Sequence, residues 1–169
     1  HVFGTGLHQT TQLCMLQLEK YIDENSVVAD LGCGSGILSV VALLLGAKSA
    51  FAVDIDANAI KTAYENADLS GVDKSKYYVT SGNVIDDKAL QDEIGYDKYD
   101  VVVANIIADV ICAISPVVPK QLKKGGVFIA SGIIKDRIDD VYKALAEVGL
   151  KVIDTSIKDE WVSITSIKE

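Results

Sequence analysis

The chain has 169 residues, of which 49% are hydrophobic, and it carries a formal net charge of -8 at pH 7. This length allows one domain with a sizeable core, and the apolar content excludes an intrinsically disordered chain. The negative charge argues against direct binding to nucleic acid and suits a basic partner.

No segment of the sequence has the pattern of a membrane anchor or a signal peptide. The longest apolar run, residues 37–45, is much shorter than the roughly 20 residues that a bilayer requires. Cys14, Cys33 and Cys112 lie far apart and form no C-x-x-C pair, which is typical of reduced thiols. We therefore expect a cytoplasmic protein without membrane contact and without a metal site.

Apolar runs and amphipathic segments alternate along the chain, which predicts alternating strands and helices. Thr10 and Thr11 are expected to open the first helix, with Cys14 and Leu18 on its apolar face. Strands are predicted at residues 26–31, 49–54, 77–80, 99–105, 126–131, 150–156 and 161–167. Further helices are predicted at residues 37–45, 57–69, 88–94, 108–122 and 136–148.

The most specific motif directly follows the first of these strands. Gly32, Gly34 and Gly36 stand at every second position, and an apolar helix comes next. Strand, glycine turn and helix together form a nucleotide-binding unit, because glycines let the backbone approach a ligand closely. Ile37 stands where the dinucleotide fingerprint has its last glycine, which favours S-adenosyl-L-methionine over NAD. The alternative is a tight turn without a ligand.

An acidic residue, Asp54, ends the second predicted strand. A carboxylate at this position can accept two hydrogen bonds from a ribose diol and so fix a nucleoside. An aspartate here could instead cap the following helix, but Asp56 fits that role better because it directly precedes Ala57. We therefore expect Asp54 to contact the cofactor.

The order of the elements predicts the fold. Alternating strands and helices require a mostly parallel sheet with right-handed crossovers. Lys158 and Asp159 form a short turn between the last two predicted strands, so the last strand should be antiparallel. We expect an α/β, Rossmann-like S-adenosylmethionine-dependent methyltransferase fold with a seven-stranded, mostly parallel sheet. Residues 1–169 are expected to form one methyltransferase domain.

Asn105 ends the fourth predicted strand and is the candidate catalytic residue. Ligands bind at the carboxyl ends of the strands in such sheets, so Asn105 should lie near the glycine turn. Its amide oxygen is an acceptor that can orient an attacking amine. The alternative is that Asn105 only caps the helix expected near Ala108.

The segment from Phe3 to Thr11 combines glycines, threonines and a histidine ahead of the first helix. We interpret it as a loop that closes over the cofactor, with Thr11 at a helix N-terminus near the methionine carboxylate. The alternative is a glycine-rich loop with a threonine cap. His8 is more typical of a residue that satisfies backbone groups than of a catalytic one.

Four motifs resemble the ribosomal protein L11 methyltransferase family, and the resemblance extends over the whole chain. The motifs are Phe3-Gly-Thr-Gly-Leu-His-Gln-Thr-Thr11, Asp30-Leu-Gly-Cys-Gly-Ser-Gly-Ile-Leu38, Val53-Asp-Ile-Asp56 and Val103-Ala-Asn-Ile106. By position, the resemblance implies cofactor contacts at Thr11, Gly32, Asp54 and Asn105. It also implies methylation of amino groups, on a lysine side chain or an N-terminal amine, of a large-subunit ribosomal protein.

Members of that family carry an N-terminal domain that recognises the ribosomal protein, whereas this chain begins at the catalytic domain. The resemblance therefore leads us to expect that the substrate-recognition domain is absent.

The expected reaction needs an uncharged amine held in line with the methyl group of the cofactor. Asn105 and the carbonyl of Ile106 are expected to orient that amine. The sequence Asn105-Ile-Ile-Ala offers no aromatic ring, which fits a flexible aliphatic amine better than a nucleobase. The sequence leaves open methylation of another amine or protein, an NAD-dependent oxidoreductase, and a scaffold that binds the cofactor without catalysis.

Overall fold

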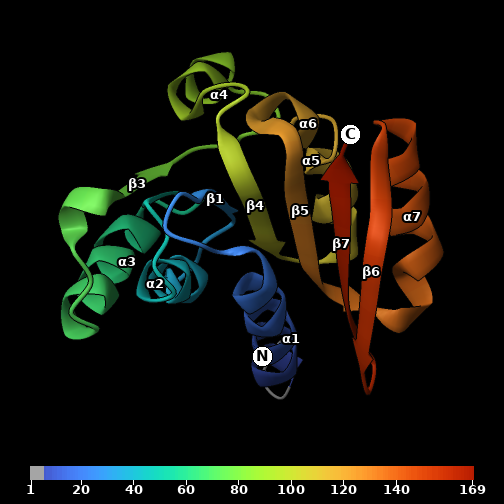
Figure 1. Cartoon of the computed structure of the whole chain (residues 1–169), viewed down its shortest axis with the longest axis horizontal. Coiled ribbons are helices and arrows are strands. Elements are labelled where there is room, and N and C mark those ends of the chain that lie inside the picture. Colours follow the sequence, from blue (N-terminus) through green and yellow to red (C-terminus); the bar gives the residue numbers. More distant parts are fainter. Residues whose placement is uncertain (1–5) are drawn as a thin grey trace.

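The computed structural model describes residues 6–169, and the side chains from residue 9 onward. In this part of the chain, seven strands form one sheet in the order β3-β2-β1-β4-β5-β7-β6 (Figure 1). The strands are β1 (Val27–Leu31), β2 (Ser49–Asp54), β3 (Tyr77–Ser81), β4 (Tyr99–Asn105), β5 (Leu122–Ile134), β6 (Leu150–Lys158) and β7 (Trp161–Lys168). Strands β1 to β5 pair in parallel, and β7 runs antiparallel to both β5 and β6. This is the predicted sheet.

Helices cover both faces of the sheet. They are α1 (Gly6–Tyr21), α2 (Ile37–Leu44), α3 (Asn58–Leu69), α4 (Lys88–Ile94), α5 (Ala108–Ile114), α6 (Val118–Gln121) and α7 (Ile138–Glu147), with 3-10 turns η1 (Lys74–Lys76) and η2 (Lys135–Arg137). Residues of α1 to α3 pack in one core, and residues of α4 to α7 pack in the other. The side chains of β4 alternate between them: Val101 and Val103 face the first core, whereas Val102 and Ala104 face the second.

The bounds of two predicted helices were wrong, and β5 extends beyond both ends of the strand predicted at residues 126–131. Helix α1 begins at Gly6, so Thr10 and Thr11 lie inside it rather than at its start. Thr10 is fully buried and its carbonyl oxygen accepts a hydrogen bond from Ser131 Oγ of β5, so packing on the sheet overrides the local preference of threonine for a cap. The helix predicted at residues 108–122 is divided into α5 and α6, because Pro116 cannot continue a helix.

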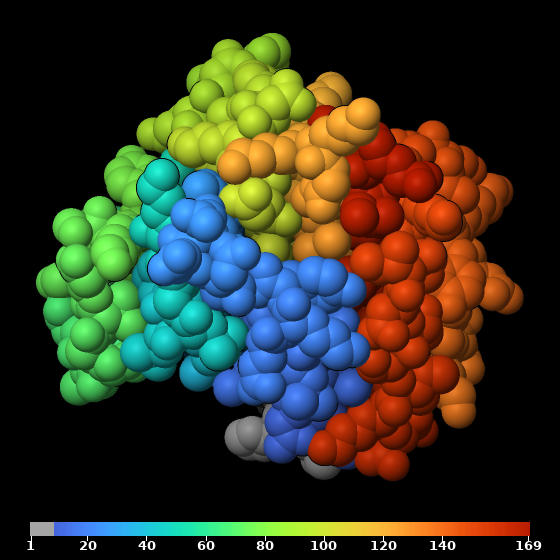
Figure 2. Space-filling view, viewed as in Figure 1, coloured from blue at the N-terminus to red at the C-terminus, as the bar shows by residue number. Residues whose placement is uncertain are grey.

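Helix α1 lies across the sheet between α2 and the hairpin formed by β6 and β7 (Figure 2). The hydrogen bonds that tie it to that hairpin include one from Gln9 Nε2 to Asp159 Oδ2 at 2.7 Å and one from Thr165 Oγ1 to Gln17 Oε1 at 3.2 Å. Among the described residues, no helix has both the length and the apolar character to cross a membrane.

Candidate cofactor site and active site

The glycine turn after β1 is fixed to the end of β2 by backbone hydrogen bonds. The amides of Gly32 and Cys33 both donate to the carbonyl oxygen of Val53, at 2.7 and 2.9 Å. The amide of Gly34 donates to Asp54 Oδ2 at 2.8 Å. These bonds place the turn and the Asp54 carboxylate side by side at the carboxyl edge of the sheet.

Gly34 differs from its neighbours in what a side chain would meet. A Cβ atom on Gly32 would lie 2.7 Å from Ile106 Cγ2, and one on Gly36 would lie 2.6 Å from the Tyr77 hydroxyl. A Cβ atom on Gly34, which has a φ of +52°, would meet no atom within 4 Å. Packing within the protein therefore accounts for Gly32 and Gly36, whereas the surface of the turn at Gly34 is open to a ligand.

Two acidic residues after β2 have different surroundings. Asp54 accepts hydrogen bonds with both carboxylate oxygens, from the amides of Gly34 and Asp56. Asp56 Oδ1 accepts from the amide of Asn58, the first residue of α3, at 2.9 Å. Asp56 thus provides an acceptor for an amide at the start of the helix, as predicted, and Asp54 is the carboxylate that faces the glycine turn.

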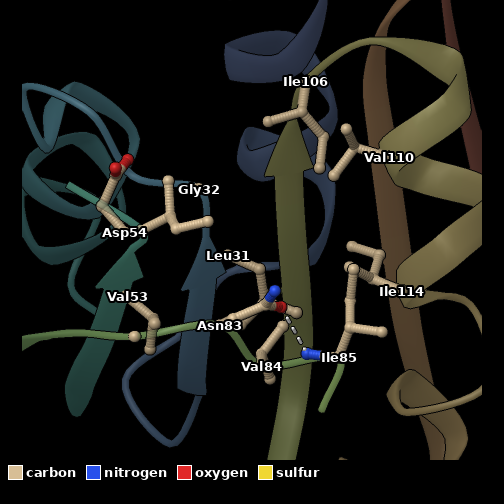
Figure 3. A pocket seen from close by; sticks show the side chains of 12 residues that line it. Leu31, Gly32, Val53, Asp54, Asn83, Val84, Ile85, Ile106, Val110 and Ile114 are labelled. Atoms are coloured by element: carbon tan, nitrogen blue, oxygen red, sulfur yellow. Dashed lines mark hydrogen bonds between the residues drawn. The ribbon is translucent and has the colours of Figure 1, made fainter. Parts of the chain in front are cut away.

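A largely apolar cavity of about 350 Å³ opens beside Asp54 and the turn (Figure 3). Gly32 and Asp54 line one side, whereas Ile106, Val110 and Ile114 line the other. The other residues that line it are Leu31, Val53, Ile55, Gly82, Asn83, Val84 and Ile85. Apolar walls with a few polar groups at the edge are typical of sites for small organic ligands.

The segment after β3 was missed in the sequence analysis. Asn83 Oδ1 accepts a hydrogen bond from the amide of Ile85 at 3.0 Å, and this turn forms part of the cavity wall (Figure 3). The signal was present, because Gly82 and Asn83 come shortly after a predicted strand, at the same edge of the sheet as Asn105, which ends one. The rule that ligands bind at the carboxyl ends of strands applies equally to them.

Asn105 ends β4, beside the cavity wall formed by Ile106. Its Nδ2 atom donates to Thr10 Oγ1 at 3.4 Å, whereas its buried Oδ1 has no hydrogen-bond partner among the described residues. A Cβ atom on Gly132 would lie 2.8 Å from that oxygen, so glycine is required where β5 passes it. A buried acceptor without a partner is unfavourable, and it is typical of a site that a ligand completes.

The N-terminal prediction needs correction. Thr11 is half-buried in the second turn of α1, so it does not offer a helix N-terminus to a carboxylate. Thr10, which precedes it, is the residue whose hydroxyl meets Asn105. Residues 3–5 of the expected loop and the side chain of His8 lie outside the part of the chain that the structure describes.

A buried carboxyl group lies beneath the glycine turn. Asp30 is 1% exposed, and its Oδ2 accepts a hydrogen bond from Ser39 Oγ of α2 at 2.6 Å. Burial raises the pKa of Asp30 to about 6, although the bonds from Ser39 oppose this shift. Burial also raises the pKa of the Cys33 thiol far above its usual range, which argues against a nucleophilic role for Cys33.

The chain is similar to known proteins of one family over nearly its whole length. The model of the family "Ribosomal protein L11 methyltransferase (PrmA)" matches residues 1–169. Two proteins named ribosomal protein L11 methyltransferase are similar to this chain. The one from Agathobacter rectalis is 50% identical over 98% of the chain, and the one from Lachnospira eligens is 47% identical over 97%. The match covers 52% of each, so the chain spans about half the length of these curated relatives.

A solved structure of a ribosomal protein L11 methylase from Lactobacillus delbrueckii subsp. bulgaricus is also similar. It superposes with a TM-score of 0.85 at 34% identity and covers 96% of this chain and 80% of its own. The family match over the whole sequence, together with this fold, shows that the chain belongs to the ribosomal protein L11 methyltransferase family.

Proposed function

We propose that the protein is an S-adenosylmethionine-dependent methyltransferase that methylates amino groups of ribosomal protein L11, and that residues 1–169 form its catalytic domain. One observation carries this proposal. The open glycine turn, the Asp54 carboxylate and the partnerless oxygen of Asn105 lie at the same edge of the sheet, where Asp54 lines one side of the cavity and Ile106, which follows Asn105, lines the other. Membership of the family supports the choice of substrate.

The residues present fit S-adenosylmethionine. The apolar walls formed by Leu31, Val53 and Ile106 suit the faces of a purine ring, and the Asp54 carboxylate suits a ribose diol. The open surface at Gly34 would accommodate the amino-acid end of the cofactor. When bound, this cofactor supplies an electrophilic methyl group on a sulfonium sulfur.

Asn105 is the residue that we propose orients the acceptor. Its Oδ1 atom can accept a hydrogen bond from the amine, and this bond fixes the direction of the nitrogen lone pair. The bond to Thr10 holds the amide plane, so little further ordering is needed when the acceptor arrives. Such positioning can supply about 7–11 kcal/mol of a reaction barrier.

The acceptor must lose its proton, because an ammonium nitrogen has no lone pair. A free lysine amine has a pKa of about 10.4, and transfer to an apolar site lowers it by disfavouring the charged form. Ile106 and Ile107, which follow Asn105, supply apolar surface of this kind and no aromatic ring. This apolar surface suits an aliphatic amine.

The test is incubation of the chain with methyl-labelled S-adenosylmethionine and purified L11. We expect label in L11 and none when its amino groups have been blocked by acetylation. Calorimetry with S-adenosylhomocysteine and with NAD is the accompanying control. Binding of NAD in preference to S-adenosylhomocysteine would contradict the proposal and favour an oxidoreductase.

A further inference from the structure

A second cavity, of about 220 Å³, lies on the other side of the end of β4. None of the residues that line it also lines the first cavity. The two cavities are separated by consecutive residues, because Ile106 lines the first and Ile107 lines the second. Strands β4 and β5 end, and β7 begins, at this edge of the sheet (Figure 1).

This second cavity adjoins the proposed catalytic residue. Gly132 forms part of its wall, and Asn105 Oδ1 packs directly against Gly132. The buried oxygen without a partner therefore lies beside the wall of the second cavity, and the next residue of the chain, Ile106, lines the first. A group-transfer enzyme must bring two reactants to one point, and this arrangement provides one cavity on each side of that point.

The walls of the second cavity combine apolar surface with a charged mouth. Ile107 is exposed, and Ile134 pairs with Trp161 across β5 and β7, so these side chains provide the apolar surface. At the mouth, Arg137 donates to Asp109 Oδ1 and to Asp140 Oδ2, each at 2.6 Å. Two carboxylates face one guanidinium, so this group is net negative.

We propose that the second cavity holds the acceptor side chain, a primary amine on an unbranched aliphatic stem, and that Asp109 attracts its cationic form. This inference rests on the methyltransferase function proposed above. Ile134 and Trp161 would pack against the methylene groups. The volume is below the range typical of sites for drug-sized ligands, which suits a single side chain.

Trp161 is the only tryptophan in the sequence, so its fluorescence reports directly on this cavity. The probe is lysine blocked at its backbone amino and carboxyl groups, titrated into the chain saturated with S-adenosylhomocysteine. Blocked norleucine, which has an unbranched stem but no amine, is the control probe. We expect a saturable change in fluorescence with the lysine probe and a much weaker response with norleucine.

Two pairs of variants test the walls and the mouth. Ile134→Arg should weaken binding of the lysine probe by at least about tenfold through like-charge repulsion. Ile153→Arg, at a similarly exposed isoleucine of β6, should leave that binding unchanged. Asp109→Asn should weaken it about 2–5-fold, the range for an exposed ion pair. Asp140→Asn removes the same unit of charge from this group, but Asp140 lies outside the cavity wall, so it should weaken binding of the probe less than Asp109→Asn does. The KM for L11 should follow the same order.

The outcomes distinguish this inference from the proposed function. Failure of the unaltered chain to bind S-adenosylhomocysteine would overturn the function and this inference with it. If that ligand binds and L11 is methylated, the cavity assignment alone is overturned by an unchanged Trp161 signal or by equal KM values within both pairs of variants. Thermal melting and the Kd for S-adenosylhomocysteine confirm that each variant folds.

Discussion

Replacement of Gly34 by alanine should weaken binding of S-adenosylhomocysteine while leaving internal packing intact. The added Cβ atom meets no protein atom within 4 Å, so it projects into the space that we assign to the ligand. Forcing one methyl group into a closely packed contact costs about 1–3 kcal/mol. The Kd should therefore rise by about 5–150-fold.

Gly71 provides a matched control for the backbone effect. Its φ is +72°, against +52° at Gly34, and a Cβ atom there also meets no atom within 4 Å. Alanine in the left-handed region costs about 1–2 kcal/mol at either position, which corresponds to a fall in Tm of about 2–8 °C. Calorimetry and thermal melting should show similar losses of stability for Gly34→Ala and Gly71→Ala, and a loss of affinity only for Gly34→Ala. Equal Kd values for the two variants would refute the assignment of the turn to the cofactor.

Three further predictions follow from individual side chains. Asp54→Ala should weaken binding of S-adenosylhomocysteine by about 1.5–3 kcal/mol in calorimetry. Asp56→Ala should mainly lower the unfolding free energy, by about 0.5–2 kcal/mol. A larger loss of affinity at Asp56 would reverse these roles. The pKa of Asp30 is raised from 3.8 to about 6, so between these pH values the folded state keeps a proton that the unfolded state has lost. The free energy of unfolding therefore falls as the pH rises through this range. The unfolding free energy of Asp30→Asn, measured with urea relative to that of the unaltered protein, should therefore rise by on the order of 3 kcal/mol between a pH below 3.8 and a pH above 6. Parallel pH profiles of the two proteins would contradict this. Asn105→Ala should slow methyl transfer to L11 by about tenfold to a hundredfold while changing the Kd for S-adenosylhomocysteine much less, and an equal loss in both would argue against an orienting role.

The sheet could be predicted because its signals are local. The glycine turn ends β1, and the short turn at Lys158 and Asp159 separates β6 from β7, so pattern and turn chemistry were enough. The break at Pro116 could also have been predicted from the sequence, since proline cannot continue a helix at that point. The start of α1 was not, because contacts between Thr10 and β5 decide it, and these partners are more than a hundred residues apart.

The site could be predicted only in part, for a related reason. Gly32 and Asp54 follow strands in one nucleotide-binding unit, so their proximity is implied by the motif. The position of Asn83 at this edge could have been predicted by the same rule, but no distinctive motif marks this residue. The second cavity is formed by α5, β5, η2 and β7, and its existence depends on how these distant segments pack.

A crystal structure of the chain with S-adenosylhomocysteine tests the central claim most directly. We predict that the adenosine lies in the cavity beside Asp54 and Ile106, that the amino-acid end lies over Gly34, and that the sulfur faces Asn105. A ligand bound away from residues 32–36, or a sulfur directed away from both Asn105 and the second cavity, would contradict the account.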